Sequence, residues 1–168
     1  MRTSLLAVLV MALVFVPGAT AAAPRAEPDL VQVFFSRNPE SFNDFAAVFP
    51  LERFVPGGPD VVEQTVAQLV AGPTPAEQAM GYFSDFSAIQ VGASTCKAQD
   101  FTLIRAGTTV TLQLCRQTSS AGIGQDARAQ SEINATVMQF SGITRVIVLT
   151  SAGHCLFDQS GMDLCLAP

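Results

Sequence analysis

The residues closest to a catalytic set lie in the last fifteen positions of the chain. His154 is the only histidine, and Cys155 follows it directly. A cysteine nucleophile needs a thiolate of low pKa beside a base, whereas Cys155 has another use in a disulfide. Asp158 and Asp163 surround a glycine, but a calcium loop needs acids or Asn at alternate positions and a late Glu. We therefore expect a turn here, with no catalytic residue, no metal site and no cofactor.

Residues 122–127 carry a second chemical pattern, Gly-x-Gly-x-x-Ala, which is similar to a dinucleotide-binding fingerprint. That fingerprint needs a strand directly before it and an acidic residue about 20 positions later. A polar loop precedes it here, and no acidic residue occurs at 141–146. We therefore interpret the pattern as a flexible loop that leads into a helix.

The N-terminus has the three parts of a secretory signal. Arg2 supplies the positive start, residues 5–16 are an unbroken apolar run, and small residues occur at Ala19 and Ala21. The run is shorter than the roughly 20 residues that a spanning helix needs. We expect cleavage after Ala21 and no membrane span in the mature chain. The expected organisation is a signal peptide at 1–21, a linker at 22–29, a domain at 30–153 and a disulfide-bonded tail at 154–168.

Charge excludes one class of partner. The signal contains one of the nine basic residues and none of the 14 acidic ones, so the mature chain has a net charge of −6. An acidic domain without a basic cluster repels phosphate backbones, so we expect no nucleic-acid partner.

Four cysteines remain in the exported part, where disulfides persist. Four cysteines allow three pairings. Cys96 and Cys115 lie on either side of a predicted hairpin turn, and Cys155 and Cys165 on either side of Gln159-Ser160-Gly161. Two local bridges, Cys96–Cys115 and Cys155–Cys165, satisfy the distance limits without moving other segments.

The elements that must position these residues follow from hydrophobic period and turn signals. We expect strands where apolar and polar residues alternate or where β-branched residues are frequent, and helices where apolar residues recur at helical spacing. We also expect a capping box at Thr74 and Glu77. The last strand, rich in Ile and Val, is expected to be central. This order predicts an α+β fold: two main helices packed on a small, mostly antiparallel sheet, stapled by disulfides. The predicted strands are 30–35, 48–55, 89–98, 101–105, 108–115 and 143–149; the predicted helices start near 60, 75 and 126; loops are expected at 36–44 and 116–123.

Four segments carry a joint pattern, at 31–35, at 49–53, at 68–74 with Glu77, and at 131–140. Together they resemble the GerM-type (GerMN) domain of sporulation and spore-germination proteins of the bacterial envelope. The resemblance spans about residues 30–153. It implies a compact domain with two main helices, similar to ring-building domains of secretion machines, and no catalytic role. The chain departs from the family in lacking a lipid-anchor cysteine and in carrying four cysteines that the pattern does not require.

The sequence therefore predicts a secreted or cell-envelope interaction or assembly module that is not an enzyme. Its expected partner is another protein or a further copy of itself. The alternative is a secreted ligand-binding domain or a hydrolase. Phe42, Phe45 and Phe49 lie in a loop-like stretch at 42–49 beside the extended piece 48–55, which is a candidate sheet edge because of its proline. These rings either pack in the core or form an exposed contact patch.

Overall fold

The structure is a computed structural model that describes residues 27–97 and 99–167. The expected signal peptide, residues 1–21, and the first part of the expected linker, residues 22–26, lie outside the described residues. Among the residues that are described, no helix combines the length and the apolar character needed to cross a bilayer.

The first half of the domain is built on a long antiparallel pair. Strand β1 (Pro28–Arg37) pairs along its length with β2 (Phe49–Pro56). The connection contains a short helix, α1 (Glu40–Asn43), where the sequence predicted only loop. In its three-stranded sheet β2 is an edge strand, as its prolines predicted.

Two helices follow, with the boundaries that their capping residues indicate. Helix α2 (Val61–Ala71) starts after Asp60, whose side chain makes no capping bond, and ends at Gly72. Helix α3 (Pro75–Ala79) has the predicted capping box. In it, the Glu77 carboxylate accepts from the Thr74 N–H at 2.7 Å, and the Glu77 N–H donates to the Thr74 hydroxyl at 3.4 Å.

The second half contains the predicted hairpin of β5 (Phe101–Ala106) and β6 (Thr109–Leu114). Helix α5 (Ile123–Met138) then returns the chain to β8 (Arg145–Leu149), which pairs parallel with β6. The expectation that this last strand is central was wrong. Since β5 already occupies the other side of β6, the crossover through α5 can only place β8 at the edge.

Short elements complete the chain. Of the expected strand 89–98, only β4 (Gln90–Val91) forms, and it pairs with β7 (Gln117–Thr118) inside the expected loop 116–123. Helix α5 begins three residues before the predicted start at Asp126, because the Gly122 carbonyl already accepts a hydrogen bond from the Asp126 N–H at 3.1 Å. The remaining elements are β3 (Tyr82–Phe83), α4 (Asp85–Ala88), β4 (Gln90–Val91), β7 (Gln117–Thr118) and the 3₁₀ helix η1 (Leu164–Leu166).

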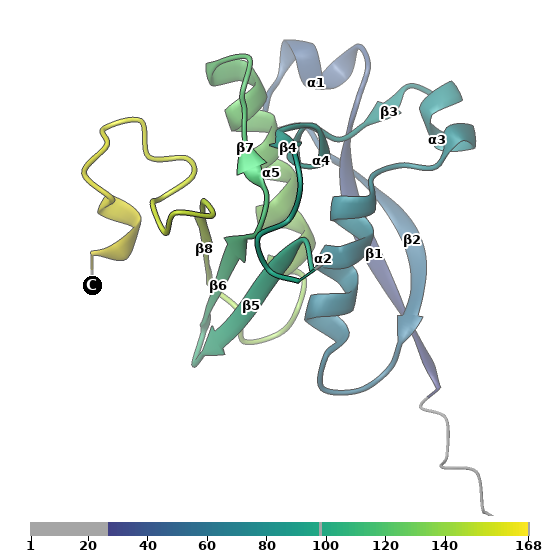
Figure 1. Cartoon of the computed structure of the whole chain (residues 1–168). Helices are drawn as coiled ribbons and strands as arrows, with labels where there is room; N and C mark the ends of the chain where they lie inside the picture. The colour runs from purple at the N-terminus through teal and green to yellow at the C-terminus, as the bar shows by residue number, and fades with distance from the viewer. Residues whose placement is uncertain (1–26, 98, 168) are drawn as a thin grey trace, which may run out of the picture.

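The core lies around the two main helices. Figure 1 shows α2 and α5 beside each other, with β1 and β2 on one side and β5, β6 and β8 on the other. Fully buried side chains come from every layer, including Phe35 of β1, Leu69 of α2, Leu112 of β6 and Ile133 of α5. The α+β class with two main helices is confirmed, and the strands of the described residues are divided among three small sheets.

Side chains from α5 and its C-cap cover the side of β1 that faces away from β2, where β3 pairs only with the last two residues of the strand. N–H groups of alternate β1 residues are about 7 Å apart, and α5 side chains three or four positions apart rise by about 5–6 Å along one face. The two spacings are close enough for two side chains of α5 and that of its C-cap residue, Gln139, to act as acceptors where a neighbouring strand would otherwise be needed. The bonds are Gln32 N–H to Gln139 at 3.1 Å, Phe34 N–H to Thr136 at 3.0 Å and Ser36 N–H to Glu132 at 3.2 Å.

Both predicted disulfides are present, with Cα–Cα distances of 5.5 Å for Cys96–Cys115 and 5.9 Å for Cys155–Cys165.

We expect replacement of the first pair, Cys96 and Cys115, by serine to lower the free energy of unfolding by about 3 kcal/mol, because the denatured chain regains loop entropy. The tail bridge closes a shorter loop, so its loss should cost about half a kcal/mol less. Urea unfolding of the two double variants measures this. A larger cost for the tail pair would contradict the entropic account.

Candidate functional site

The aromatic side chains singled out in the sequence occupy the surface around α1. Phe42 is 54% exposed and Phe45 is 42% exposed, although both are large apolar residues. The neighbouring Ile123, the first residue of α5, is 68% exposed. The ring of Phe45 lies against the first turn of α5, where a Cβ on Gly124 would come within 3.1 Å of the ring. The contact patch considered from the sequence is therefore on the surface at Phe42 and Phe45.

The segment that carries the two rings is fixed by local hydrogen bonds. The hydroxyl of the buried Ser41 accepts from the Arg37 N–H at 2.8 Å and donates to the Ala47 carbonyl at 2.6 Å. Asp44 accepts from the Ala46 N–H at 2.9 Å, which closes the turn between the rings. These bonds tie both ends of the segment to the end of β1.

Arg128 of α5 lies beneath the rings and organises them. Its guanidinium carbon is 4.7 Å from the ring centre of Phe42, 5.3 Å from that of Phe45 and 5.8 Å from that of Phe83. Phe42 and Phe83 also stack, with ring centres 5.2 Å apart. Each cation–π contact is worth about 0.5–2 kcal/mol depending on desolvation. We call Phe42, Phe45, Phe83 and Ile123 the aromatic surface.

Arg128 is itself held in place by a buried carboxylate. Its Nε donates to Asp85 Oδ2 at 2.5 Å, and the two side chains are 10% and 9% exposed. Gln125 donates to the other oxygen of Asp85 at 3.0 Å. The guanidinium therefore has little freedom to move, and neither do the rings that rest on it.

One turn further along α5, Glu132 is fully buried and anchors three segments to one another. Its carboxylate accepts five hydrogen bonds, three of them from backbone N–H groups. Because β1, α4 and α5 all meet at this carboxylate, it fixes the base on which the aromatic surface stands. The donors are Ser36 N, Ser36 Oγ, Ser84 Oγ, Asp85 N and Phe86 N, at 2.7–3.2 Å.

Burial raises the pKa of Glu132 above its ordinary value of 4.5, while the hydrogen bonds from Ser36, Phe86, Ser84 and Asp85 oppose that rise. The folded protein therefore keeps this proton to a higher pH than the unfolded chain does.

We expect the contribution of Glu132 to stability to be largest at acid pH and to fall as pH rises through the pKa of Glu132 in the folded protein. The difference in unfolding free energy between the protein and Glu132→Gln, measured across pH 4–8, isolates this term. A difference that grows with pH would contradict it.

Phe49 lies on a second arginine and not on Arg128. The guanidinium carbon of Arg37 is 4.1 Å from the ring centre of Phe49 and 5.8 Å from that of Tyr82. Arg37 also pairs with Glu40 at 2.8 Å. The three phenylalanines predicted as contacts are thus divided, with Phe42 and Phe45 on one arginine and the partly buried Phe49 on the other.

The polar residues of the tail bond to one another. His154 Nδ1 lies 2.9 Å from Asp163 Oδ2, and the His154 side chain is 70% exposed. The other oxygen of Asp163 accepts from the Cys155 N–H at 2.8 Å, and Asp158 accepts from Ser160 and from the Leu164 N–H. Hydrogen bonds from His154 and then from Cys155 lower the pKa of Asp163. Asp158 and Asp163 therefore stabilise the fold of the tail through these hydrogen bonds. Cys155 forms a disulfide with Cys165.

No three His, Cys, Asp or Glu side chains in residues 27–97 and 99–167 are grouped so as to hold a metal ion.

Gly122, the first residue of the fingerprint-like pattern, has a positive φ of 126°. It precedes α5, and it follows the short β7 and a loop. The described residues thus assemble a rigid aromatic surface on a buried ionic base.

Sequence reasoning missed Arg128, Asp85 and Glu132. One signal was available: Arg128 and Glu132 precede Thr136 at intervals of four, so they continue the buried stripe of α5. Polar residues at core spacing indicate a buried network, which needs partners from other elements. The partners come from distant segments, and no local pattern identifies them.

No protein-family model matches the chain, and no curated protein matches it. Two solved structures are similar. One, of the tandem GerMN domains of the sporulation protein GerM from Bacillus subtilis, has a TM-score of 0.48 and 15% identity, over 82% of this chain and 47% of that one. The other, a putative lipoprotein from Clostridium perfringens, has a TM-score of 0.38 and 13% identity, over 80% and 83% of the two chains.

This chain spans about half the length of the tandem-domain structure. That structure is of GerMN domains, the domain type that the sequence resembles.

Proposed function

We propose that this protein is a non-enzymatic interaction module of the bacterial envelope or extracellular space, and that it binds a protein partner through the aromatic surface. The observation that carries the proposal is the exposure of two large rings, Phe42 and Phe45, on a buried arginine. Exposed apolar groups of this size cost solubility, so their retention on a rigid base indicates contact with another molecule.

The rings are suited to binding because they are ordered before a partner arrives. Each side chain that must be immobilised on binding costs about 0.5–1.5 kcal/mol. Stacking on Phe83 and support from Arg128 restrict Phe42 in the free protein, so less of this cost remains. Aromatic anchors at the centre of an apolar patch are typical of residues that dominate binding energy.

Two features support a site of action outside the cytoplasm. All four cysteines are paired, and disulfides of this kind persist in oxidising compartments. The N-terminal sequence has the three parts of a secretory signal. A partner at the envelope or in the medium would meet the aromatic surface there.

Site-specific photo-crosslinking in the producing organism tests the proposal. A benzophenone amino acid at Ile123 leaves the rings intact and lies at the margin of the aromatic surface. We expect ultraviolet light to give one discrete adduct, whose mass and peptides identify the partner protein or a second copy of the chain. Changing Phe42 and Phe45 to serine in the same background should abolish the adduct.

The matched control places the same crosslinker at Phe54, which is 74% exposed on β2. This position is more exposed than Ile123 but lies outside the aromatic surface. No discrete adduct is expected from it. Absence of an adduct at Ile123, or the same adducts from both positions, would refute the proposal.

A further inference from the structure

The open edge of β8 is a second feature with the means to bind. The backbone of a strand alternates, so residues two apart direct their N–H and C=O groups to the same side. Val148 accepts from the Leu156 N–H at 2.8 Å, and Thr150 donates to the His154 carbonyl at 2.8 Å, both on the side away from β6. Val146 shares this parity, so its backbone groups also point away from β6.

The chain itself shows what this edge accepts. After β8 it turns back, and residues 154–156 run antiparallel beside Val148 to Thr150, with a bridge between Leu149 and Cys155. It then leaves the edge at Phe157 for the disulfide loop. Within the described part of the chain, no loop backbone or side chain bonds to Val146. The edge is therefore covered along one half and open along the other.

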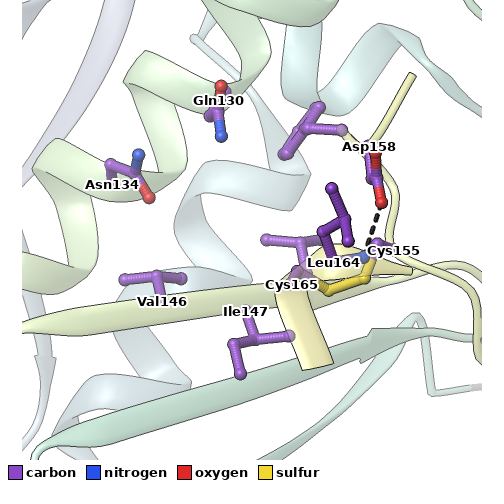
Figure 2. Close-up of a pocket in the computed structure, with 10 residues that line it drawn as sticks. Gln130, Asn134, Val146, Ile147, Cys155, Asp158, Leu164 and Cys165 are labelled. Atoms are coloured by element: carbon purple, nitrogen blue, oxygen red, sulfur yellow. Dashed lines mark hydrogen bonds between the residues drawn. A yellow bond between two sulfur atoms is a disulfide. The ribbon is translucent and has the colours of Figure 1, made fainter. Parts of the chain in front are cut away.

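A cavity of about 340 Å³ lies at the open half. Val146 is in register with the core residue Val110, and Ile147 with Thr111 on the opposite face of the sheet. Figure 2 shows the two side chains on opposite sides of β8, and both line the cavity. Because the cavity contacts side chains on both faces of β8, it extends around the edge of that strand. The N–H and C=O groups of Val146 point toward this edge.

The walls of the cavity suit a neutral, extended backbone. Gln130 and Asn134 of α5 reach one side of it, and neither amide bonds to another described residue. Leu164 and Phe157 supply apolar surface from the tail. Asp158 is the one charged group among the described residues that line the cavity, and it accepts from the Leu164 N–H at 2.6 Å and from Ser160.

We infer that this cavity is a docking site for one short extended segment of a partner protein, which adds antiparallel to β8 at Val146 and places an apolar side chain between α5 and the tail. Strand addition of this kind takes its affinity from main-chain hydrogen bonds. Residues 154–156 already pair with Val148 to Thr150, so Val146 is the one position of β8 whose outward backbone groups have no partner among the described residues. One short segment needs only this position, whereas edge-to-edge pairing with the β5 strand of a second copy needs a longer run of free backbone groups.

Nuclear magnetic resonance with a defined probe tests the inference. The probe is the capped tripeptide acetyl-Thr-Val-Thr-amide, titrated to millimolar concentration into the ¹⁵N-labelled protein. The matched control peptide carries an N-methyl group on its valine, which removes one N–H donor. We expect the probe to shift the Val146 amide and the Asn134 side chain, and the N-methyl peptide to bind about tenfold more weakly through loss of one hydrogen bond.

Two variants separate binding from folding. Proline is tolerated on an edge strand where the N–H faces outward, so Val146→Pro should keep the fold and lose the probe. Gln130→Ala with Asn134→Ala should weaken binding, while the Phe42 and Phe45 serine variant should bind the probe unchanged. Equal binding of both peptides, or no shift at Val146, would overturn the inference. Concentration-dependent changes at Val146 without probe would overturn it too, by assigning the edge to self-pairing.

Discussion

Replacing Glu132 by alanine is expected to lower the free energy of unfolding by about 3–5 kcal/mol, the largest effect of any single substitution considered for this protein. The change leaves three buried backbone N–H groups, those of Ser36, Asp85 and Phe86, without their acceptor. A buried donor without a partner costs about 1–3 kcal/mol. The two serine hydroxyls can turn to other acceptors, so most of the loss comes from the backbone. Urea unfolding followed by circular dichroism measures it.

Glu132→Gln distinguishes hydrogen bonding from side-chain volume. Both carboxylate oxygens accept from backbone N–H groups, Oε1 from Ser36 and Asp85 and Oε2 from Phe86. An amide of the same shape must therefore direct its own NH₂ group at a backbone donor, so this variant should also be destabilised. The matched control is Glu52→Gln on the exposed face of β2, expected within about 0.5 kcal/mol of the unchanged protein. Full stability of Glu132→Gln would show that the hydrogen bonds to Glu132 contribute little.

Changing Phe42 and Phe45 together to serine is expected to weaken binding of the crosslinked partner by about 100- to 1,000-fold, or about 3–4 kcal/mol. The reason is that both rings are exposed apolar anchors on a fixed base, so their loss removes contact area and leaves Arg128 uncovered. Titration calorimetry with the purified partner measures the change. Stability should fall much less than in Glu132→Ala, because the rings are about half exposed.

Leu30 and Phe54 provide the matched control for this substitution. They face each other across β1 and β2, and they are 55% and 74% exposed. Serine at both removes comparable apolar surface from another part of the domain. Binding is expected to stay within about threefold of the unchanged protein, as for residues outside an interface. An equal loss from both double variants would mean that general surface hydrophobicity, and not the aromatic surface, drives association.

The elements that the sequence predicts well are those governed by local chemistry. The capping box at Thr74 depends on residues three positions apart, and the hairpin of β5 and β6 depends on alternation around Ala106-Gly107. Each disulfide joins cysteines on either side of one turn. In each case the information lies within about twenty residues, so a single sequence contains it.

The parts that could not be predicted depend on contacts between distant segments. The edge position of β8 is decided by β5, which occupies the far side of β6, and β-branched composition does not indicate that order. The pairing of Arg128 with Asp85 joins α5 to α4 across 43 positions. Phe42 and Phe49 are close in sequence, yet they lie on different arginines, because the chain turns between them at Asp44 to Ala47.

Hydrogen exchange of the protein, alone and bound to its crosslinked partner, tests most directly whether the aromatic surface is the interface. Backbone amides buried by a partner exchange more slowly than in the free protein. The account predicts new protection over residues 41–47 and over the first turn of α5, from Ile123 to Asp126, with little change along β2. Protection confined to β2 and the exposed Leu30 and Phe54, with none around α1, would contradict it.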